Sequence, residues 1–302
     1  MPDPTSLPAA EPSADSASPS GQRICVRHLT RFLYHGPVTD SFNEVRLRPL
    51  SDATQTCTRF ELRLTPEATV REYEDFHKNR VHYFDLPAPH TQLDIEAISL
   101  VETQPERRPL PLTPFAPSLL DDPAFGFEHF DFLADSSFVP LAVPLRHEVK
   151  QLLGDTIHDL WADAVRLGEH VHDILTYSPN ATKVNTRVVD VLESRRGVCQ
   201  DYAHLMLGLC RGAGIPARYV SGYFLNPQRA PDAIEASHAW VEILLPGYGW
   251  RGYDPTHRRL PGTNYVKLAI GRDYGDIRPV SGTFRGLGTR EMIVEVQVRG
   301  AE

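Results

Sequence analysis

The feature that most constrains the fold is an apolar run, residues 203–210, which follows a glycine-containing turn that carries Cys199. Gly212 and Gly214 end the run. A run that is apolar on nearly every face predicts a buried helix. Cys199 would then lie in its first turn, where unpaired N–H groups and the helix dipole favour an anion such as a thiolate. The position therefore predicts a nucleophile.

Two partners for this thiol follow later in the sequence. Residues 237–245 predict a strand that begins near His238, and residues 250–253 predict a second strand that leads into Asp254. If the two strands pair antiparallel about the turn between them, His238 and Asp254 lie nearly opposite one another. A carboxylate beside an imidazole fixes its tautomer and stabilises the imidazolium. An imidazole that also faces Cys199 would hold a thiolate–imidazolium pair, so the predicted catalytic residues are these three.

The motifs around these residues resemble the transglutaminase-like superfamily of cysteine enzymes, in its bacterial branch with an N-terminal β domain. The resemblance covers roughly residues 24–299 and implies an α+β fold, in which an N-terminal antiparallel β domain precedes a transglutaminase-like, papain-like core. It also implies that Cys199 is the nucleophile, His238 the general base and acid, and Asp254 the orienting carboxylate. The motifs that carry it are residues 26–30, 34, 43–49, 89–93, 197–201, 214–223, 237–240, 249–250, 254–256 and 271–276.

The resemblance implies acyl transfer through a thioester. The Cys199 thiolate would attack an amide carbonyl, backbone N–H groups at the helix start would hold the oxyanion, and His238 would protonate the departing amine. Water as the second nucleophile makes a protease or amidase, and an amine makes a transglutaminase. We expect hydrolysis, because bacterial members with this architecture are commonly regarded as peptidases. A non-catalytic peptide-binding module is the remaining alternative, and the presence of all three residues argues against it.

The expected substrate is a peptide or protein amide. We expect no cofactor and no metal, because no dense acidic loop suggests activation by calcium. Four residues near the predicted site are candidates for the walls of a substrate groove: Gln200, Trp240, Trp250 and Tyr223.

Helix geometry argues against a zinc site built from Cys199, His204 and Cys210. The two cysteines would stand about 16 Å apart along the axis, and His204 would point about 140° away from Cys199. Zinc needs ligand distances of roughly 2.0–2.3 Å, so the three cannot share one ion. We therefore expect His204 to be a half-buried helix residue, Cys210 to lie in the core and Asp201 to be structural. Cys199, His238 and Asp254 as ligands are a poorer alternative to catalysis.

Periodicity divides the chain into five segments. Pro, Ser and Ala dominate the start, strict alternation then predicts strands, a proline-rich stretch leads to the alternating aromatics of 125–132, and a helical period begins at Thr156. We expect Thr186 to cap a helix over 188–194, and Arg218 to pair with a carboxylate on a neighbouring strand. The segments are a disordered tail (1–23), a β domain (24–102), a connector with an aromatic docking segment (103–155), the catalytic core (156–280) and a C-terminal β segment (281–302). The resemblance implies that this last segment is β structure, and the N-terminal sheet is its candidate partner.

The chain has 302 residues and a formal charge of −8, from 31 basic and 39 acidic residues. This length is enough to bury a large core, and the charge argues against nucleic acid or an anionic membrane as partner. The start lacks the pattern of a secretion signal and no stretch is apolar enough to span a bilayer, so the cytoplasm is the expected location. Four cysteines are too few for a disulfide scaffold, and we expect Cys25 and Cys57 to be buried thiols.

Overall fold

The computed structural model describes residues 21–111, 113–120, 122–179, 186–226, 228, 237–286 and 290–301. The predicted disordered tail lies outside the described residues up to residue 20, and its last residues, 22 and 23, already belong to the first strand.

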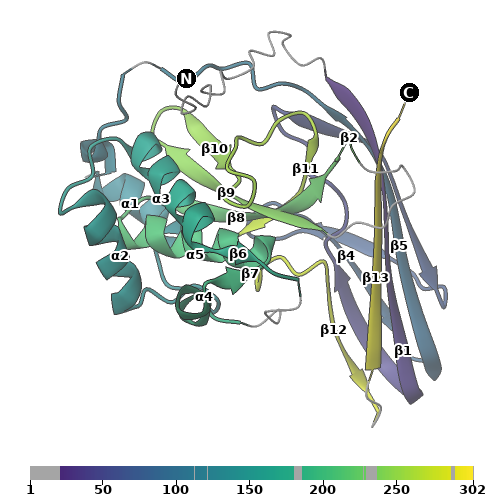
Figure 1. The fold of residues 1–302 in the computed structure, drawn as a ribbon. Coiled ribbons are helices and arrows are strands. Elements are labelled where there is room, and N and C mark those ends of the chain that lie inside the picture. Colours follow the sequence, from purple (N-terminus) through teal and green to yellow (C-terminus); the bar gives the residue numbers. More distant parts are fainter. Residues whose placement is uncertain are drawn as a thin grey trace, which may run out of the picture.

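One long, bent strand, β1 (Gln22–Val45), organises the N-terminal β domain (Figure 1). Its first half pairs antiparallel with β5 and β13, and its second half pairs antiparallel with β4 and β12. Alternate side chains of β5 are buried, as expected for a strand with one face on the core. The other strands of this domain are β2 (Gln55–Thr65), β3 (Arg71–Glu74), β4 (Arg80–Leu86), β5 (His90–Thr103), β12 (Val280–Arg285) and β13 (Arg290–Gly300).

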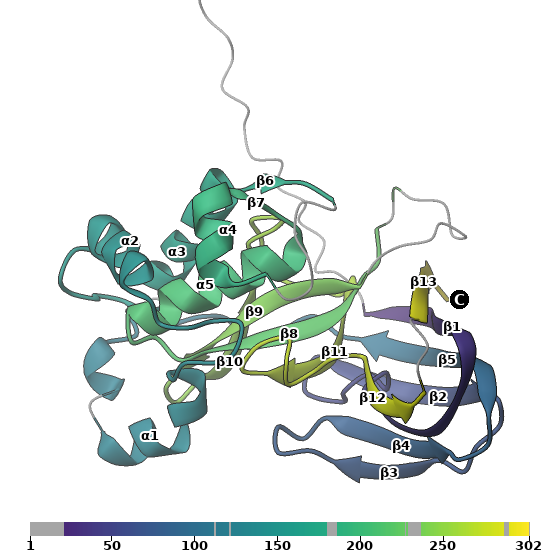
Figure 2. The same ribbon diagram turned by 90° about the horizontal axis from the view of Figure 1, so that it is seen from below.

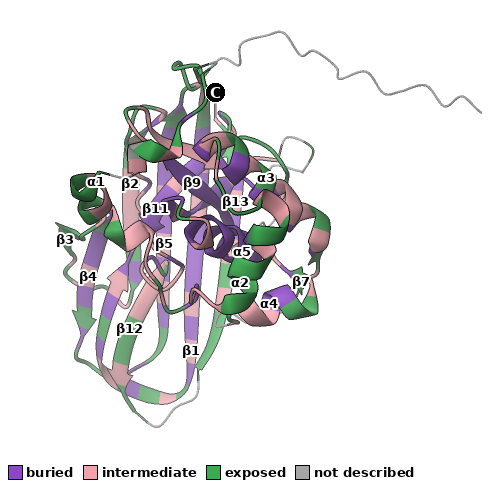
Figure 3. Cartoon of the chain, turned by 90° about the vertical axis from the view of Figure 1, so that its left-hand side faces the viewer, coloured by how far each residue is buried: buried purple, intermediate pink, exposed green. Residues whose placement is uncertain are grey.

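The second module is an antiparallel four-stranded sheet in the order β10-β9-β8-β11, with helices packed on one face (Figure 2). Helix α5 (Cys199–Gly212) lies against this face and is buried at every residue from 201 to 211 (Figure 3). The run that was apolar in sequence is therefore the central helix. The strands are β8 (Ala217–Phe224), β9 (His238–Leu245), β10 (Gly249–Tyr253) and β11 (Tyr265–Gly271).

The remaining elements include helices that pack against α5. Leu145 and Val149 of α2 are buried in the same hydrophobic cluster as α5, so part of the predicted 103–155 connector belongs to the core. None of the described helices is both long and apolar enough to cross a membrane. These elements are η1 (Pro117–Leu120), α1 (Pro123–Glu128), η2 (Phe130–Phe132), α2 (Val143–Leu153), α3 (Leu160–Ile174), β6 (Thr176–Tyr177), α4 (Val188–Ser194) and β7 (Arg196–Gly197).

Two helix starts differ from the sequence expectation. The Asp159 carboxylate accepts the N–H groups of Trp161 and Ala162, so α3 begins a turn later than the period predicted. Arg187, not Thr186, is the N-cap of α4, and its side chain makes no capping hydrogen bond.

Side-chain amides of the β domain hold the edge of the four-stranded sheet. The Asn79 amide donates to the Ile270 carbonyl and accepts the Ile270 N–H, both at 2.8 Å. Gln55 makes the same pair of bonds with the backbone of Lys267, each at 2.7 Å. Because β11 is the edge strand, these amides take the place of a neighbouring strand and satisfy buried backbone groups.

The two modules also share apolar packing. Tyr223 of β8 and Val266 and Leu268 of β11 belong to the hydrophobic cluster of the β domain. In the aromatic segment, the Phe132 ring lies 4.9 Å from that of Trp250 and 5.6 Å from that of His77, and so contacts both modules.

Candidate active site

A glycine-dependent turn sets Cys199 at the first residue of α5. The Asp201 carboxylate reaches back to accept the Val198 N–H at 2.8 Å, which gives Asp201 the structural role expected from the sequence. A Cβ atom added to Gly197 would lie 2.5 Å from the Cβ of Asp201, so this contact leaves room only for glycine. The Cys199 side chain remains partly exposed, with its Sγ 3.8 Å from the Ser237 carbonyl oxygen.

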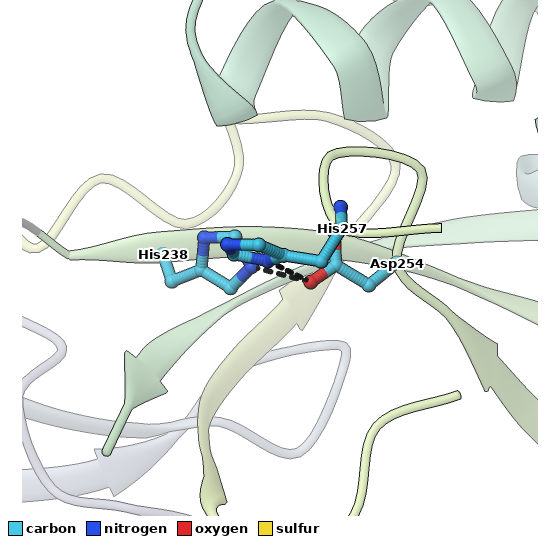
Figure 4. A group of neighbouring side chains, drawn as sticks. All are labelled: His238, Asp254 and His257. Atoms are coloured by element: carbon cyan, nitrogen blue, oxygen red, sulfur yellow. Dashed lines mark hydrogen bonds and ion pairs between the residues drawn. The ribbon is translucent and has the colours of Figure 1, made fainter. Parts of the chain in front are cut away.

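His238 and Asp254 meet as the paired strands predicted. Tyr253 of β10 lies opposite Val241 of β9, which brings the next residue, Asp254, beside the start of β9. The His238 Nε2 atom donates to Asp254 Oδ2 at 2.8 Å (Figure 4). Both residues are buried, with 7% and 0% of their surface exposed.

His238 also interacts with Cys199. Burial disfavours the charged imidazole, but hydrogen bonds and Coulombic attraction to Asp254 and Cys199 outweigh it and raise the pKa of His238 to about 10. Since Nε2 is engaged by Asp254, Nδ1 is the ring nitrogen that remains for the thiol. Asp254 and Cys199 thus both favour the charged form of the His238 imidazole.

Asp254 has more partners than the sequence indicated. Its Oδ2 atom accepts hydrogen bonds from His238, from His257 Nδ1 at 2.7 Å and from the Tyr265 hydroxyl at 2.7 Å. Its Oδ1 atom accepts the N–H groups of Thr256 and His257. Burial opposes the negative charge, but bonds from the two histidines hold the pKa of Asp254 well below its usual range.

Sequence reasoning missed His257 and Tyr265. His257 stands three residues after Asp254, which was a usable signal because a turn can bring such residues together. Tyr265 starts a separate strand, and nothing in its spacing links it to Asp254.

The groove candidates do not gather around the thiol. Tyr223 is 1% exposed and hydrogen-bonds to His28 of the β domain, so its assignment to a groove is wrong. Trp240 and Trp250 line a cavity of about 480 Å³, but Cys199, His238 and Asp254 are not among the residues that line it. Gln200 lies beside Cys199 in the first turn of α5 and is partly buried.

The Arg218 guanidinium in the same cavity pairs with Glu242 on β9, as predicted, with Nε 2.7 Å from the carboxylate. It also lies 4.1 Å from the centre of the Trp250 ring. This wall is thus held by a buried ion pair and a cation–π contact.

The other candidate residues are structural. His204 is 1% exposed, more buried than expected, and its Nε2 accepts the Tyr274 N–H. Burial lowers the pKa of His204 to about 4 and raises the pKa of Cys210 to about 12. Cys25 and Cys57 are partly exposed free thiols rather than buried ones, and they flank β5 on opposite sides.

The fold and this arrangement define an α+β protein of the transglutaminase type. Two family models match the chain: the transglutaminase-like superfamily over residues 149–255, and the bacterial transglutaminase-like N-terminal region over residues 24–102. The chain belongs to the transglutaminase-like superfamily.

Some similar proteins match most of this chain, and others match only part of it. An uncharacterized protein of Mycobacterium leprae is 34% identical over 286 residues, which cover 91% of this chain and 98% of that protein. A protein-glutamine gamma-glutamyltransferase of Pseudomonas aeruginosa is 38% identical over 91 residues, 28% of this chain and 14% of that protein. The crystal structure of a "putative cysteine protease" from Cytophaga hutchinsonii shares the fold, with a TM-score of 0.75 and 22% identity over 94% of this chain and 92% of that one.

Proposed function

We propose that this protein hydrolyses amide bonds in peptides or proteins, with Cys199 as nucleophile, His238 as general base and acid, and Asp254 as the orienting carboxylate. The observation that supports this most is the 2.8 Å hydrogen bond from His238 Nε2 to buried Asp254, with the Cys199 thiol interacting with the same imidazole. This is the relation of nucleophile, base and third group that activates a weak nucleophile.

In the first half of the reaction, the thiol proton moves to His238 Nδ1 and the thiolate adds to the amide carbonyl. The first N–H groups of a helix have no acceptor within the preceding turn, and that of Cys199, the first residue of α5, is the proposed donor to the oxyanion. Collapse breaks the C–N bond, and His238 gives its proton to the departing amine, which leaves a thioester on Cys199. In the second half, His238 takes a proton from water, the hydroxide displaces the thiolate, and a carboxylic acid is released.

Transfer to an amine is the second candidate. The Pseudomonas aeruginosa relative that matches over 91 residues bears the name of a protein-glutamine gamma-glutamyltransferase. The same thioester serves both outcomes, and only the second nucleophile differs. Water is always present at the partly exposed Cys199, whereas transfer requires the site to hold an amine and exclude water, so we favour hydrolysis.

Mass spectrometry of glutamine-containing peptides, incubated with and without a primary amine, separates the two outcomes. Hydrolysis predicts a free acid whose yield is insensitive to the amine. Products that carry the amine would make the protein a transglutaminase instead. If neither product forms with any peptide of a broad library, the proposed activity is wrong.

A thiol-directed amide probe tests the nucleophile. We expect labelling of the wild type and of Cys57→Ala, a matched control that removes another partly exposed thiol. Labelling should disappear in Cys199→Ala. Equal labelling of Cys199→Ala and the wild type would remove Cys199 from this role.

A further inference from the structure

Three potential metal ligands converge beside the candidate site. His238 Nε2 and His257 Nδ1 point at the same oxygen of Asp254, and the ligand atoms of the three residues all lie within 4.8 Å of one another (Figure 4). Two imidazole nitrogens and one carboxylate oxygen form a donor set that zinc and other late divalent transition metals bind, whereas magnesium and calcium prefer oxygen ligands.

The carboxylate is already held in position. Its Oδ1 accepts two backbone N–H groups, at 2.9 and 3.2 Å, from the turn that carries His257. The Tyr265 hydroxyl bonds to Oδ2 and itself accepts a hydrogen bond from Arg259 at 3.0 Å. Partners of this kind orient the ligands of metal sites.

The cluster also has a route to solvent. The His257 side chain is 37% exposed, whereas those of His238 and Asp254 are 8% and 0% exposed. Ligands on a tetrahedral zinc ion stand about 3.3 Å apart, given bond lengths of roughly 2.0–2.1 Å. The present separations of 2.7 and 2.8 Å therefore each need to open by about half an ångström. Movement of the exposed His257 ring opens the first, and the second needs a small shift of the buried His238 ring away from Asp254. Water can complete the coordination from the exposed side.

We propose that His238, Asp254 and His257 form a binding site for a divalent transition-metal ion of the zinc class, and that the bound ion reversibly inhibits the thiol chemistry. The ion binds His238 Nε2 and His257 Nδ1 in place of the protons on these two nitrogens. Each imidazole then carries its proton on its other nitrogen, which is Nε2 in His257 and Nδ1 in His238. A metal-bound His238 that carries its proton at Nδ1 cannot accept the proton of Cys199. Inhibition rests on the proposed function, but binding of the ion does not.

Binding is measured first, by calorimetry with Zn²⁺ and by the visible absorption of bound Co²⁺. The parent protein is Cys199→Ala, which removes the nearby thiol as a competing ligand. We expect one ion per chain, with no competition from excess Mg²⁺. Adding His257→Gln should weaken binding at least tenfold, whereas the control His147→Gln, an exposed helix histidine on α2, should not change it.

If Cys199→Ala does not bind the ion, but the single variant His257→Gln with its thiol intact does, the ion lies on the thiol and the proposal is wrong. Equal affinity of Cys199→Ala with and without His257→Gln would also overturn it. In the wild type, turnover should fall with Zn²⁺ and return on chelation, and His257→Gln should need at least tenfold more Zn²⁺ for the same fractional loss relative to its own metal-free rate. A protein that binds the ion but hydrolyses no amide would refute the proposed function and leave the site standing.

Discussion

At the scale of single residues, Asp254 makes one contact that the sequence predicted and another that it could not predict. The spacing of His238 and Asp254 about a turn was sufficient to predict their contact, because pairing in a hairpin follows from local sequence. Tyr265 comes from a strand on the other edge of the sheet, and its bond to Asp254 depends on tertiary packing. The buried carboxylate thus has its predicted partner, a second partner, His257, from its own turn, and a third that only the tertiary fold provides.

Asp254→Asn tests the orienting role. The amide can turn its NH₂ group toward His238 Nε2, which would force the proton of His238 onto Nδ1 and leave no acceptor for the thiol proton. We expect turnover to fall by roughly 10³–10⁴ while the fold is retained. Single-turnover kinetics of the purified variant measure the loss of turnover, and circular dichroism measures whether the fold is retained.

Tyr265→Phe is the matched control, because it removes one hydrogen bond to the same oxygen and keeps the carboxylate. We expect a fall of about tenfold or less in turnover, since one hydrogen bond is worth roughly 0.5–1.5 kcal/mol. An Asp254→Asn variant that turns over like the wild type, or that unfolds, would mean that the carboxylate is structural.

At the scale of elements, the sequence predicted strands and helices where periodicity was strong. Strands β2 and β5 lie in the predicted β domain, β13 lies in the predicted C-terminal β segment, and the central helix appears where expected, because each has one face or all faces on a core. Helix α2 was missed because it follows a proline-rich stretch and is too short to show a clear period. Its burial depends on α5, which lies far along the chain.

The turn at residues 77–80 contains a left-handed residue that is not glycine. Lys78 has φ of +67°, a left-handed conformation that usually favours glycine, so the absence of glycine did not prevent the turn. The same turn presents Asn79 to the backbone of Ile270. Sequence alone could not assign that contact, because its two sides are 191 residues apart.

Asn79→Ala should therefore destabilise the protein. It leaves the buried N–H and C=O groups of Ile270 without their partner, and each unsatisfied group costs about 1–3 kcal/mol. We expect a loss of roughly 2–4 kcal/mol in the free energy of unfolding, seen as a lower urea midpoint with an unchanged slope. Lys78→Gly, in the same turn, should change stability by about 1 kcal/mol or less. Equal midpoints for Asn79→Ala and the wild type would show that this link does not stabilise the interface.

At the scale of the whole molecule, the two modules have separate hydrophobic clusters and share a buried interface. Residues of β8 and β11 lie in the hydrophobic cluster of the β domain, and a buried histidine crosses the same interface. His28 of β1 is 2% exposed, and its Nδ1 lies 2.9 Å from the hydroxyl of Tyr223 on β8. The sequence predicted the two modules, but not that Tyr223 belongs to their contact rather than to a groove.

This interface should make stability depend on pH. Burial lowers the pKa of His28 to about 4, from about 6.5 in the unfolded chain. Below pH 6.5 the unfolded state binds a proton that the folded state does not, so stability falls as the pH drops from about 6.5 to about 4. The full loss from this residue is roughly 3 kcal/mol, at 1.36 kcal/mol per pKa unit.

His28→Gln isolates that contribution, because glutamine can still hydrogen-bond to Tyr223 but does not titrate. Unfolding free energies from urea titrations at pH 7.5 and pH 4.5 give the loss for each protein. Burial also lowers the pKa of His204 to about 4. The pH-dependent stability from His204 and from the carboxylates is the same in both proteins and cancels in the comparison. The variant should lose roughly 2–3 kcal/mol less than the wild type over this interval. Equal losses for the two proteins would mean that His28 binds its proton as readily in the folded protein as in the unfolded chain, so that this contact between the modules does not make stability depend on pH.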